Sequence, residues 1–385
     1  MGWHSSASCD RRRPKCGCHG RGVCGRVFQM RKSTAAERRG RGTHAMTSCL
    51  VGVVLVTVFI SGCRKQQVVR RTVVVYTAHD RVLSEPILRL FEQRTGIAVH
   101  PVYDTEASKT TGLVGRLIAR RDDPDCDVFW NNEIVQTIRL ARMGLLARYV
   151  SEQARRFPAA WRDGQGRWTG FAARARLLIY NTDLVRNTAP PSGLRDFTDP
   201  KWRGAGAVAR PFFGTTLTHA AVLHQAWGPQ RLAHWCRAIR RNDVALCTGN
   251  ATVRDLVAAG ERSFGLTDTD DAHAAMLEGK PVAVAVPDAE AFGAVLIPNT
   301  VALVAGCPHG EEGRRLIDFL LSAEVERALA AGRAAQIPLA TDLGDVKTPW
   351  DDLLKRGKLA EVDLPAAADA IPQVVELLRR EKMDQ

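Results

Sequence analysis

Residues 72–103 read TVVVYTAHDRVLSEPILRLFEQRTGIAVHPVY, and this stretch decides the fold. Its β-branched start, residues 73–76, predicts a buried strand. A helical pattern follows, in which Ser84 is expected to cap the helix and Gly96 to end it. A second strand is predicted over residues 98–103. A strand, a helix and a strand in this order indicate a parallel sheet with helical connections.

The same alternation continues along the chain. Further helices are predicted at 108–120, 134–143 and 311–321, and further strands at 127–130, 177–180 and 299–304. The strand at 177–180 opens a second set of strands and helices that runs to about residue 286. Two sets of similar size predict two lobes with a cleft between them. The last strand and helix return the chain to the first lobe, a layout compatible with hinge closure over a ligand.

The expected fold class is α/β, a two-lobed arrangement in which each lobe contains a doubly wound sheet. The chain has 385 residues, and about 320 of them follow Cys63, which is more than one hydrophobic core usually serves. The predicted parts are 70–172 for the first lobe, 173–296 for the second, and 297–385 for the return to the first lobe with the C-terminal helices.

The net charge of +13 lies mostly outside the predicted lobes. Residues 1–45 hold eleven Lys or Arg against two acidic residues, so the rest of the chain is only mildly basic. We therefore expect no nucleic-acid partner, although basic chains often bind phosphate backbones. This leader either is disordered or results from a start codon upstream of the true one. A disulfide between Cys236 and Cys247 stays an open alternative.

A lipoprotein signal is predicted at residues 46–63. A mostly apolar run, residues 49–61, leads into Ile60-Ser61-Gly62-Cys63. The run is too short to cross about 30 Å of hydrocarbon as a helix, which favours a signal peptide over a transmembrane anchor. We expect lipid on Cys63 and a periplasmic or other extracytoplasmic domain held at a membrane. A buried core helix is the alternative.

Polar residues directly after the predicted strands are the candidate binding residues, because ligands of open α/β sheets bind beyond the carboxyl ends of the strands. The candidates are His79, Asp80, Glu106, Ser108, Thr215, Thr216, Asn250, Asp268 and Asp270. Carboxylates with one imidazole suit a hard cation, and helix starts suit an anion. The predicted cation ligands are His79, Asp80, Glu106, Asp268 and Asp270. Helix capping and solvated helix starts are the structural alternatives.

Sequence patterns of common enzymes are missing from the chain. It has no Gly-x-Ser-x-Gly, no phosphate-binding loop that ends in Gly-Lys-Ser or Gly-Lys-Thr, and no His-Glu-x-x-His. We therefore expect a binding protein without a cofactor rather than an enzyme. An extracytoplasmic enzyme or a sensory module is the alternative from another class.

Several motifs together resemble family 1 extracellular solute-binding proteins, nearest to the ferric-iron binders of ABC importers. The motifs are Val75-Tyr76-Thr77-Ala78-His79-Asp80, Asp127-Val128-Phe129-Trp130, Arg174-Ala175-Arg176, Ile179-Tyr180-Asn181-Thr182-Asp183, Ile297-Pro298-Asn299-Thr300 and Leu316-Ile317-Asp318-Phe319-Leu320-Leu321-Ser322. The resemblance implies a two-lobed periplasmic-binding fold, a monomer, and delivery of the ligand to a permease and an ATPase.

The resemblance also raises the question of the ligand. Ferric binders of this type carry tyrosines at ligand positions, whereas this chain has four tyrosines and places Thr267-Asp268-Thr269-Asp270-Asp271 where a tyrosine pair is expected. Either carboxylates replace phenolates around Fe³⁺, or the ligand is a small organic solute such as a phosphonate-like anion or an amine. Arg174 either neutralises a bound anion or pairs within the hinge.

Overall fold

The computed structural model describes residues 71–104 and 111–385, which belong to one compact unit, Gln67–Gln385. The predicted leader, the lipoprotein signal with Cys63, and the candidates Glu106 and Ser108 lie outside the described residues. No helix within the described ranges is both long enough and apolar enough to span a bilayer.

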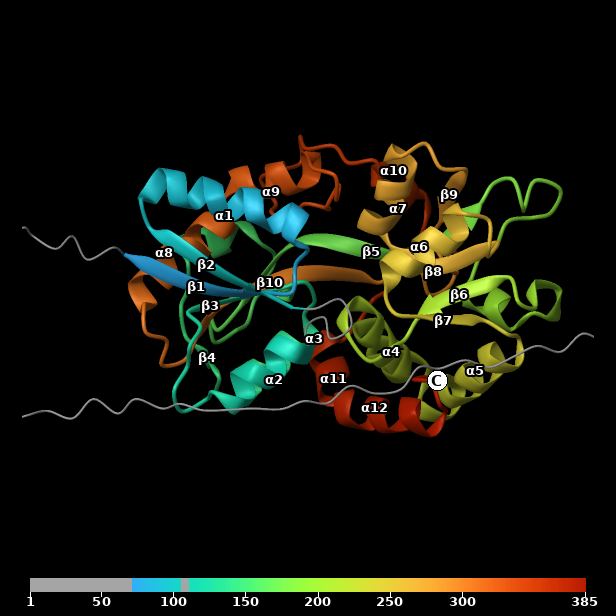
Figure 1. The fold of residues 1–385 in the computed structure, drawn as a ribbon, viewed down its shortest axis with the longest axis horizontal. Helices are drawn as coiled ribbons and strands as arrows, with labels where there is room; N and C mark the ends of the chain where they lie inside the picture. The colour runs from blue at the N-terminus through green and yellow to red at the C-terminus, as the bar shows by residue number, and fades with distance from the viewer. Residues whose placement is uncertain (1–70, 105–110) are drawn as a thin grey trace, which may run out of the picture. The chain divides into compact units, whose positions relative to one another are not determined.

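The first strand–helix–strand unit is present as predicted. β1 (Thr72–Thr77) pairs in parallel with β2 (Ala98–Tyr103), and α1 (Arg81–Thr95) connects them (Figure 1). Gly96 ends α1 with a φ of 69°, a conformation that glycine adopts without steric penalty.

The predicted start of α1 at Ser84 is wrong, because the helix begins at Arg81. Ser84 is buried within the first turn, and its hydroxyl donates to the carbonyl of Asp80 at 3.0 Å. A serine hydroxyl can bond a carbonyl four residues back as readily as it caps a helix, so the sequence signal has two structural meanings.

The strands form one continuous ladder in the order β2-β1-β3-β10-β5-β8-β6-β7, with β4 beside β10 and β9 beside β5. The remaining strands are β3 (Val128–Asn131), β4 (Leu146–Ala147), β5 (Thr169–Asn181), β6 (Gly206–Ala209), β7 (Ala245–Cys247), β8 (Phe264–Asp268), β9 (Val282–Ala285) and β10 (Leu296–Val304). β1, β2 and β3 are mutually parallel, as are β6, β7 and β8, whereas β5 and β10 run antiparallel to their neighbours.

Helices cover the sheets on both sides (Figure 1). The remaining α-helices are α2 (Thr111–Ala119), α3 (Val135–Arg142), α4 (Gly214–Trp227), α5 (Pro229–Arg241), α6 (Asn250–Ala258), α7 (Thr269–Leu277), α8 (Gly310–Leu320), α9 (Ala323–Ala331), α10 (Asp351–Arg356), α11 (Leu364–Asp369) and α12 (Ile371–Arg380). Short 3₁₀ helices lie at Glu152–Arg156, Ala159–Trp161, Leu194–Thr198 and Pro200–Trp202.

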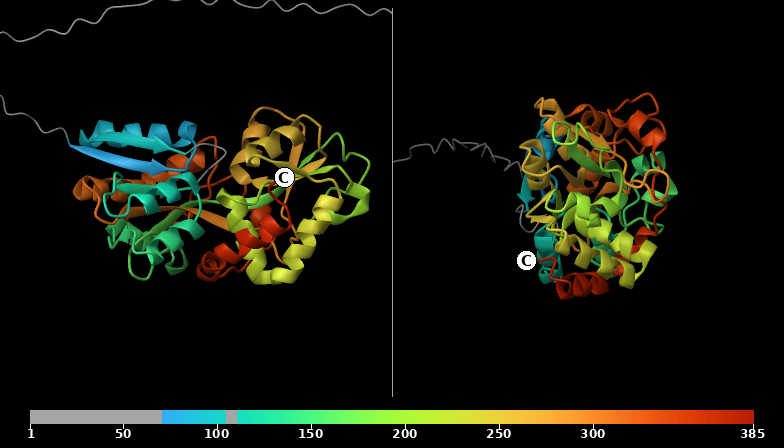
Figure 2. Two further views of the ribbon diagram at one scale, coloured as in Figure 1. Left: turned by 60° about the horizontal axis from the view of Figure 1, so that its bottom comes forward. Right: turned by 90° about the vertical axis from the view of Figure 1, so that its right-hand side faces the viewer.

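β5 connects the two lobes, which Figure 2 shows side by side. Its first half pairs with β10, from Thr169 opposite Val301 to Ala175 opposite Leu296. Its second half, from Arg176 onward, pairs with β8. The expected two-lobed α/β fold is therefore confirmed, but each lobe has a mixed sheet because β5 and β10 cross between the lobes in antiparallel fashion.

The chain after β10 contacts both lobes. α8 packs on β10 and β1, and α9 packs on β5. α11 then contacts α3 and α4, and α12 contacts α4 and α5. The lobe boundaries at residues 172 and 296 stay predictions. Cys126, Cys236, Cys247 and Cys307 are free thiols.

Candidate functional site

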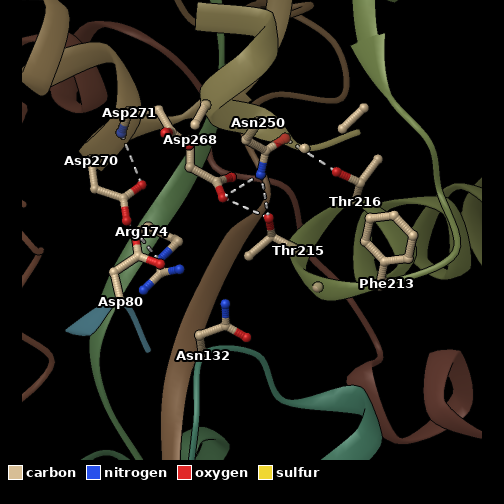
Figure 3. A pocket seen from close by; sticks show the side chains of 14 residues that line it. Asp80, Asn132, Arg174, Phe213, Thr215, Thr216, Asn250, Asp268, Asp270 and Asp271 are labelled. Atoms are coloured by element: carbon tan, nitrogen blue, oxygen red, sulfur yellow. Dashed lines mark hydrogen bonds and ion pairs between the residues drawn. The ribbon is translucent and has the colours of Figure 1, made fainter. Parts of the chain in front are cut away.

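A cavity of about 180 Å³ lies where elements of both lobes meet (Figure 3). The first lobe contributes Asp80 after β1 and Asn132 after β3. The second contributes the starts of α4, α6 and α7. The lining residues are Asp80, Asn132, Arg174, Ala209, Phe213, Gly214, Thr215, Thr216, Gly249, Asn250, Ala251, Asp268, Asp270 and Asp271.

The structure brings most of the predicted binding residues to this one cavity. Asp80, Arg174, Thr215, Thr216, Asn250, Asp268 and Asp270 all line it. His79 is buried beside the cavity rather than among its lining residues. Its Nε2 atom lies 3.0 Å from Nε2 of the buried Gln336.

Asp268 is held by groups from three other elements. Arg176, on β5, places Nη1 2.7 Å from Oδ1 of Asp268. Thr215 donates its hydroxyl to Oδ2 at 2.6 Å, and Asn250 donates Nδ2 to the same oxygen at 2.9 Å. Both carboxylate oxygens therefore already accept strong hydrogen bonds, and the network fixes the starts of α4, α6 and α7 relative to one another.

Arg174 lies within the cavity wall and is buried, with 4 % of its surface exposed. Burial by itself lowers the pKa of Arg174. The carboxylates of Asp270, Asp268, Asp80 and Asp271 outweigh burial, and they keep this pKa above its ordinary value. Arg174 is thus a permanent positive charge, with its Nε atom 3.6 Å from Oδ2 of Asp270.

A cluster of carboxylates forms the acidic side of the cavity. One oxygen each of Asp268, Asp270 and Asp271 lie within 4.8 Å of one another. Asp271 also lies 3.7 Å from Nη1 of Arg254. Hard cations prefer carboxylate oxygens at such spacing, but a cation here competes with arginines for the same oxygens.

No tyrosine lines the cavity in the part of the chain that the structure describes. Tyr76 donates its hydroxyl to Asp125 at 2.5 Å, and Tyr149 donates to Asp318. These phenols therefore have structural partners away from the site. A cation in this cavity would have carboxylates rather than phenolates as its protein ligands.

Besides α7, two further helices begin at the cavity. α4 starts at Gly214 and α6 at Asn250, and both residues line it. Backbone N–H groups at helix starts favour anions, because the first turn leaves its donors without helical partners. The cavity therefore combines an acidic side, at the start of α7, with the N-termini of α4 and α6.

Comparison with known proteins identifies the family. Residues 128–363 match the family described as bacterial extracellular solute-binding protein, which is more than half of the chain. The chain belongs to this family.

Two curated relatives of this extracellular solute-binding protein differ in their named ligands. Iron uptake protein A1 of Synechocystis sp. is 24 % identical over 303 residues, which is 74 % of this chain and 82 % of that protein. A protein of Salmonella typhimurium named "Putative 2-aminoethylphosphonate-binding periplasmic protein" is 27 % identical over 277 residues, which is 70 % of this chain and 77 % of that protein.

The fold also matches solved structures. Apo ferric ion-binding protein A of Pasteurella haemolytica superimposes with a TM-score of 0.71 at 19 % identity, covering 82 % of this chain and 99 % of that one. This likeness confirms the predicted fold. Membership of a family of solute-binding proteins likewise confirms that the protein binds a solute rather than catalysing a reaction, outside the cytoplasm.

Sequence reasoning missed Arg176 as part of the site of this solute-binding protein. A signal was present, because side chains two residues apart on a strand point to the same face. Arg174 and Arg176 stand two apart on β5. The choice of Arg174 as a candidate therefore also predicts Arg176 near the site.

Proposed function

We propose that this protein is the solute-binding subunit of an ABC importer and that its cargo is ferric iron or another hard cation. The observation that carries the proposal is the acidic wall of the cavity. Among the described lining residues, four are aspartates and one is an arginine. This imbalance favours a cationic cargo, and the iron-binding names of several relatives and structural neighbours support it.

The expected ligands come from both lobes. Asp80 lies on the first lobe, and Asp270 and Asp271 lie on the second, so one ion can hold the lobes together. Asp268 contributes indirectly, because Arg176, Thr215 and Asn250 occupy its oxygens. The proposed roles of His79, Glu106 and Ser108 stay predictions from the sequence.

Removal of two carboxylates tests the cargo. We expect Asp270→Asn combined with Asp271→Asn to weaken binding of Fe³⁺, supplied as its nitrilotriacetate complex, by at least about tenfold, since each amide removes a charged oxygen ligand. Isothermal titration of the wild-type and variant proteins measures this. Asp123→Asn, at a side chain that is 86 % exposed, is the matched control. Wild-type protein that binds none of Fe³⁺, Mn²⁺ or Zn²⁺ would rule out the cation.

A second candidate cargo is an organic solute with an anionic group and an amine. Its specific support is that Arg174 and the starts of α4 and α6 line the same cavity as the aspartates. Titration with 2-aminoethylphosphonate separates the two candidates. Binding of this compound, together with no binding of the metal ions, would move the assignment to the organic solute.

The partners and the anchor complete the proposal. We propose that the protein is a monomer that delivers its cargo to a permease and an ATPase, and that lipid on Cys63 holds it at a membrane. Mass spectrometry of detergent-extracted protein tests the anchor. We expect an N-terminal peptide that begins at a lipid-modified Cys63, since the predicted signal is removed directly before this residue. An unmodified peptide that runs through Gly62-Cys63 would contradict it.

A further inference from the structure

A line of four buried polar side chains joins Arg174, in the cavity wall, to His79, beside the cavity. Arg174 donates Nη2 to Oδ1 of Asn299 at 3.0 Å. Asn299 donates Nδ2 to Oε1 of Gln336 at 2.8 Å, and Nε2 of Gln336 lies 3.0 Å from Nε2 of His79. Asn299 and Gln336 are fully buried, with no exposed surface. We call these four residues the relay.

The direction of the hydrogen bonds in the relay is fixed at its cavity end. Arg174 can only donate, so the Asn299 atom that faces it must be the amide oxygen. Asn299 Nδ2 also faces the carbonyl of Ala172, which can only accept. Both ends of the Asn299 amide are therefore determined independently. It follows that Oε1 of Gln336 accepts from Asn299 and that Nε2 of Gln336 donates to His79.

The donor from Gln336 favours one tautomer of His79. An imidazole nitrogen that accepts a hydrogen bond carries no proton, so neutral His79 holds its proton on Nδ1. The backbone N–H of Asp80 lies 3.1 Å from Nδ1 and favours the opposite tautomer. The contact with Gln336 outweighs the contact with Asp80. In the Nε2–H tautomer an N–H group of His79 would face an N–H group of the fully buried Gln336, and neither would have an acceptor there. The contact with Asp80 is only partly buried.

We propose that Asn299 and Gln336 are positioning residues of the solute site: they hold His79 as its Nδ1–H tautomer and tie the segment that carries His79 and Asp80 to Arg174. The relay thereby fixes two cavity residues relative to each other, Asp80 after β1 and Arg174 on β5. Its effect on affinity rests on the proposed function, whereas its effect on the tautomer does not.

The tautomer is measured directly by long-range ¹H–¹⁵N correlation spectra of protein labelled with ¹⁵N-histidine, at about pH 8 where neutral imidazole prevails. We expect the Nδ1–H pattern for His79 in the wild type, with His79→Gln to assign the signal. In Gln336→Leu the donor is lost, so the ring should change to Nε2–H. Gln336→Glu should cause the same change, because its carboxylate only accepts. Gln93→Leu, at an exposed position, is the control.

The outcomes separate the parts of the proposal. An Nε2–H pattern in the wild type, or an unchanged tautomer in the Gln336 variants, would overturn the relay whatever the cargo is. If Gln336→Leu does not fold, Gln336→Glu still decides the matter. For positioning, we expect the same variants to weaken binding of Fe³⁺-nitrilotriacetate or 2-aminoethylphosphonate, whichever the wild type binds, by about three- to thirtyfold. A changed tautomer with unchanged affinity would overturn the positioning role.

Discussion

Arg176→Met should lower the free energy of unfolding by about 3–5 kcal/mol, because it leaves the carboxylate of Asp268 buried without its charged partner. Arg176 has no exposed side-chain surface, and the side chain of Asp268 is 3 % exposed, so water compensates poorly for the lost partner. The variant should also lose the fixed arrangement of Thr215 and Asn250 at the cavity. Urea unfolding monitored by circular dichroism measures the loss.

Two controls give this prediction a sharp outcome. Arg186→Ala removes an exposed ion pair with Asp183 and should change the free energy by less than about 1 kcal/mol. The double variant Arg176→Met with Asp268→Leu removes both buried charges and should be more stable than Arg176→Met alone. A single variant as stable as Arg186→Ala would show that the pair does not hold the site together.

Glu326→Ala should also be destabilising by about 3–5 kcal/mol, because it leaves three backbone donors without an acceptor. The Glu326 carboxylate accepts from the N–H groups of Ala172 at 2.8 Å and of Leu339 and Ala340 at 3.0 Å each. Ala172 lies on β5 with a φ of 42°, a strained conformation for a residue with a Cβ, so its hydrogen bonds hold this part of β5 in shape. Glu324→Ala, on the same helix but exposed, should have little effect.

The contribution of Glu326 to the free energy of unfolding should decrease as the pH rises, which is the opposite of the usual behaviour of a carboxylate. Burial raises the pKa of Glu326 above its ordinary value of 4.5, and its three backbone donors offset burial only in part. The folded protein therefore holds this proton more tightly than the unfolded chain does. Stability from this group is greatest below pH 4.5 and falls as the pH rises through the raised pKa.

The difference in unfolding free energy between wild type and Glu326→Ala should consequently shrink over the pH range above 4.5, the ordinary pKa of this group. Urea unfolding of both proteins across this range measures it. A difference that grows with pH would mean that the backbone donors outweigh burial.

The fold was predictable where local patterns repeat along the chain. The unit of residues 72–103 has a β-branched strand, an amphipathic helix and a glycine stop, and each of these is a short-range signal. β5 was predicted only over its last residues. It is buried along nearly all of its thirteen residues, so the alternation of polar and apolar side chains that marks a half-exposed strand is missing.

The candidate site was predictable only in part, because its pairings join distant residues. Ligands of α/β sheets bind beyond the carboxyl ends of the strands. This rule predicted that Asp80, Asn250 and Asp268 lie near one edge, and all three line the cavity. Nothing in the local sequence shows that Arg176 neutralises Asp268, which is 92 residues away. The partnership of Glu326 with Ala172 likewise depends on how the chain folds back after β10.

Both sheets use β5, and this limits how segments of the protein can be exchanged with those of a relative. Residues 169–175 belong to one sheet and residues 176–180 to the other, without a break in the strand. β10 and the helices after it then pass back across both halves. Neither half is a continuous cassette, so a chimera that grafts the specificity of a relative onto this scaffold must exchange several separate segments and cut within hydrogen-bonded strands.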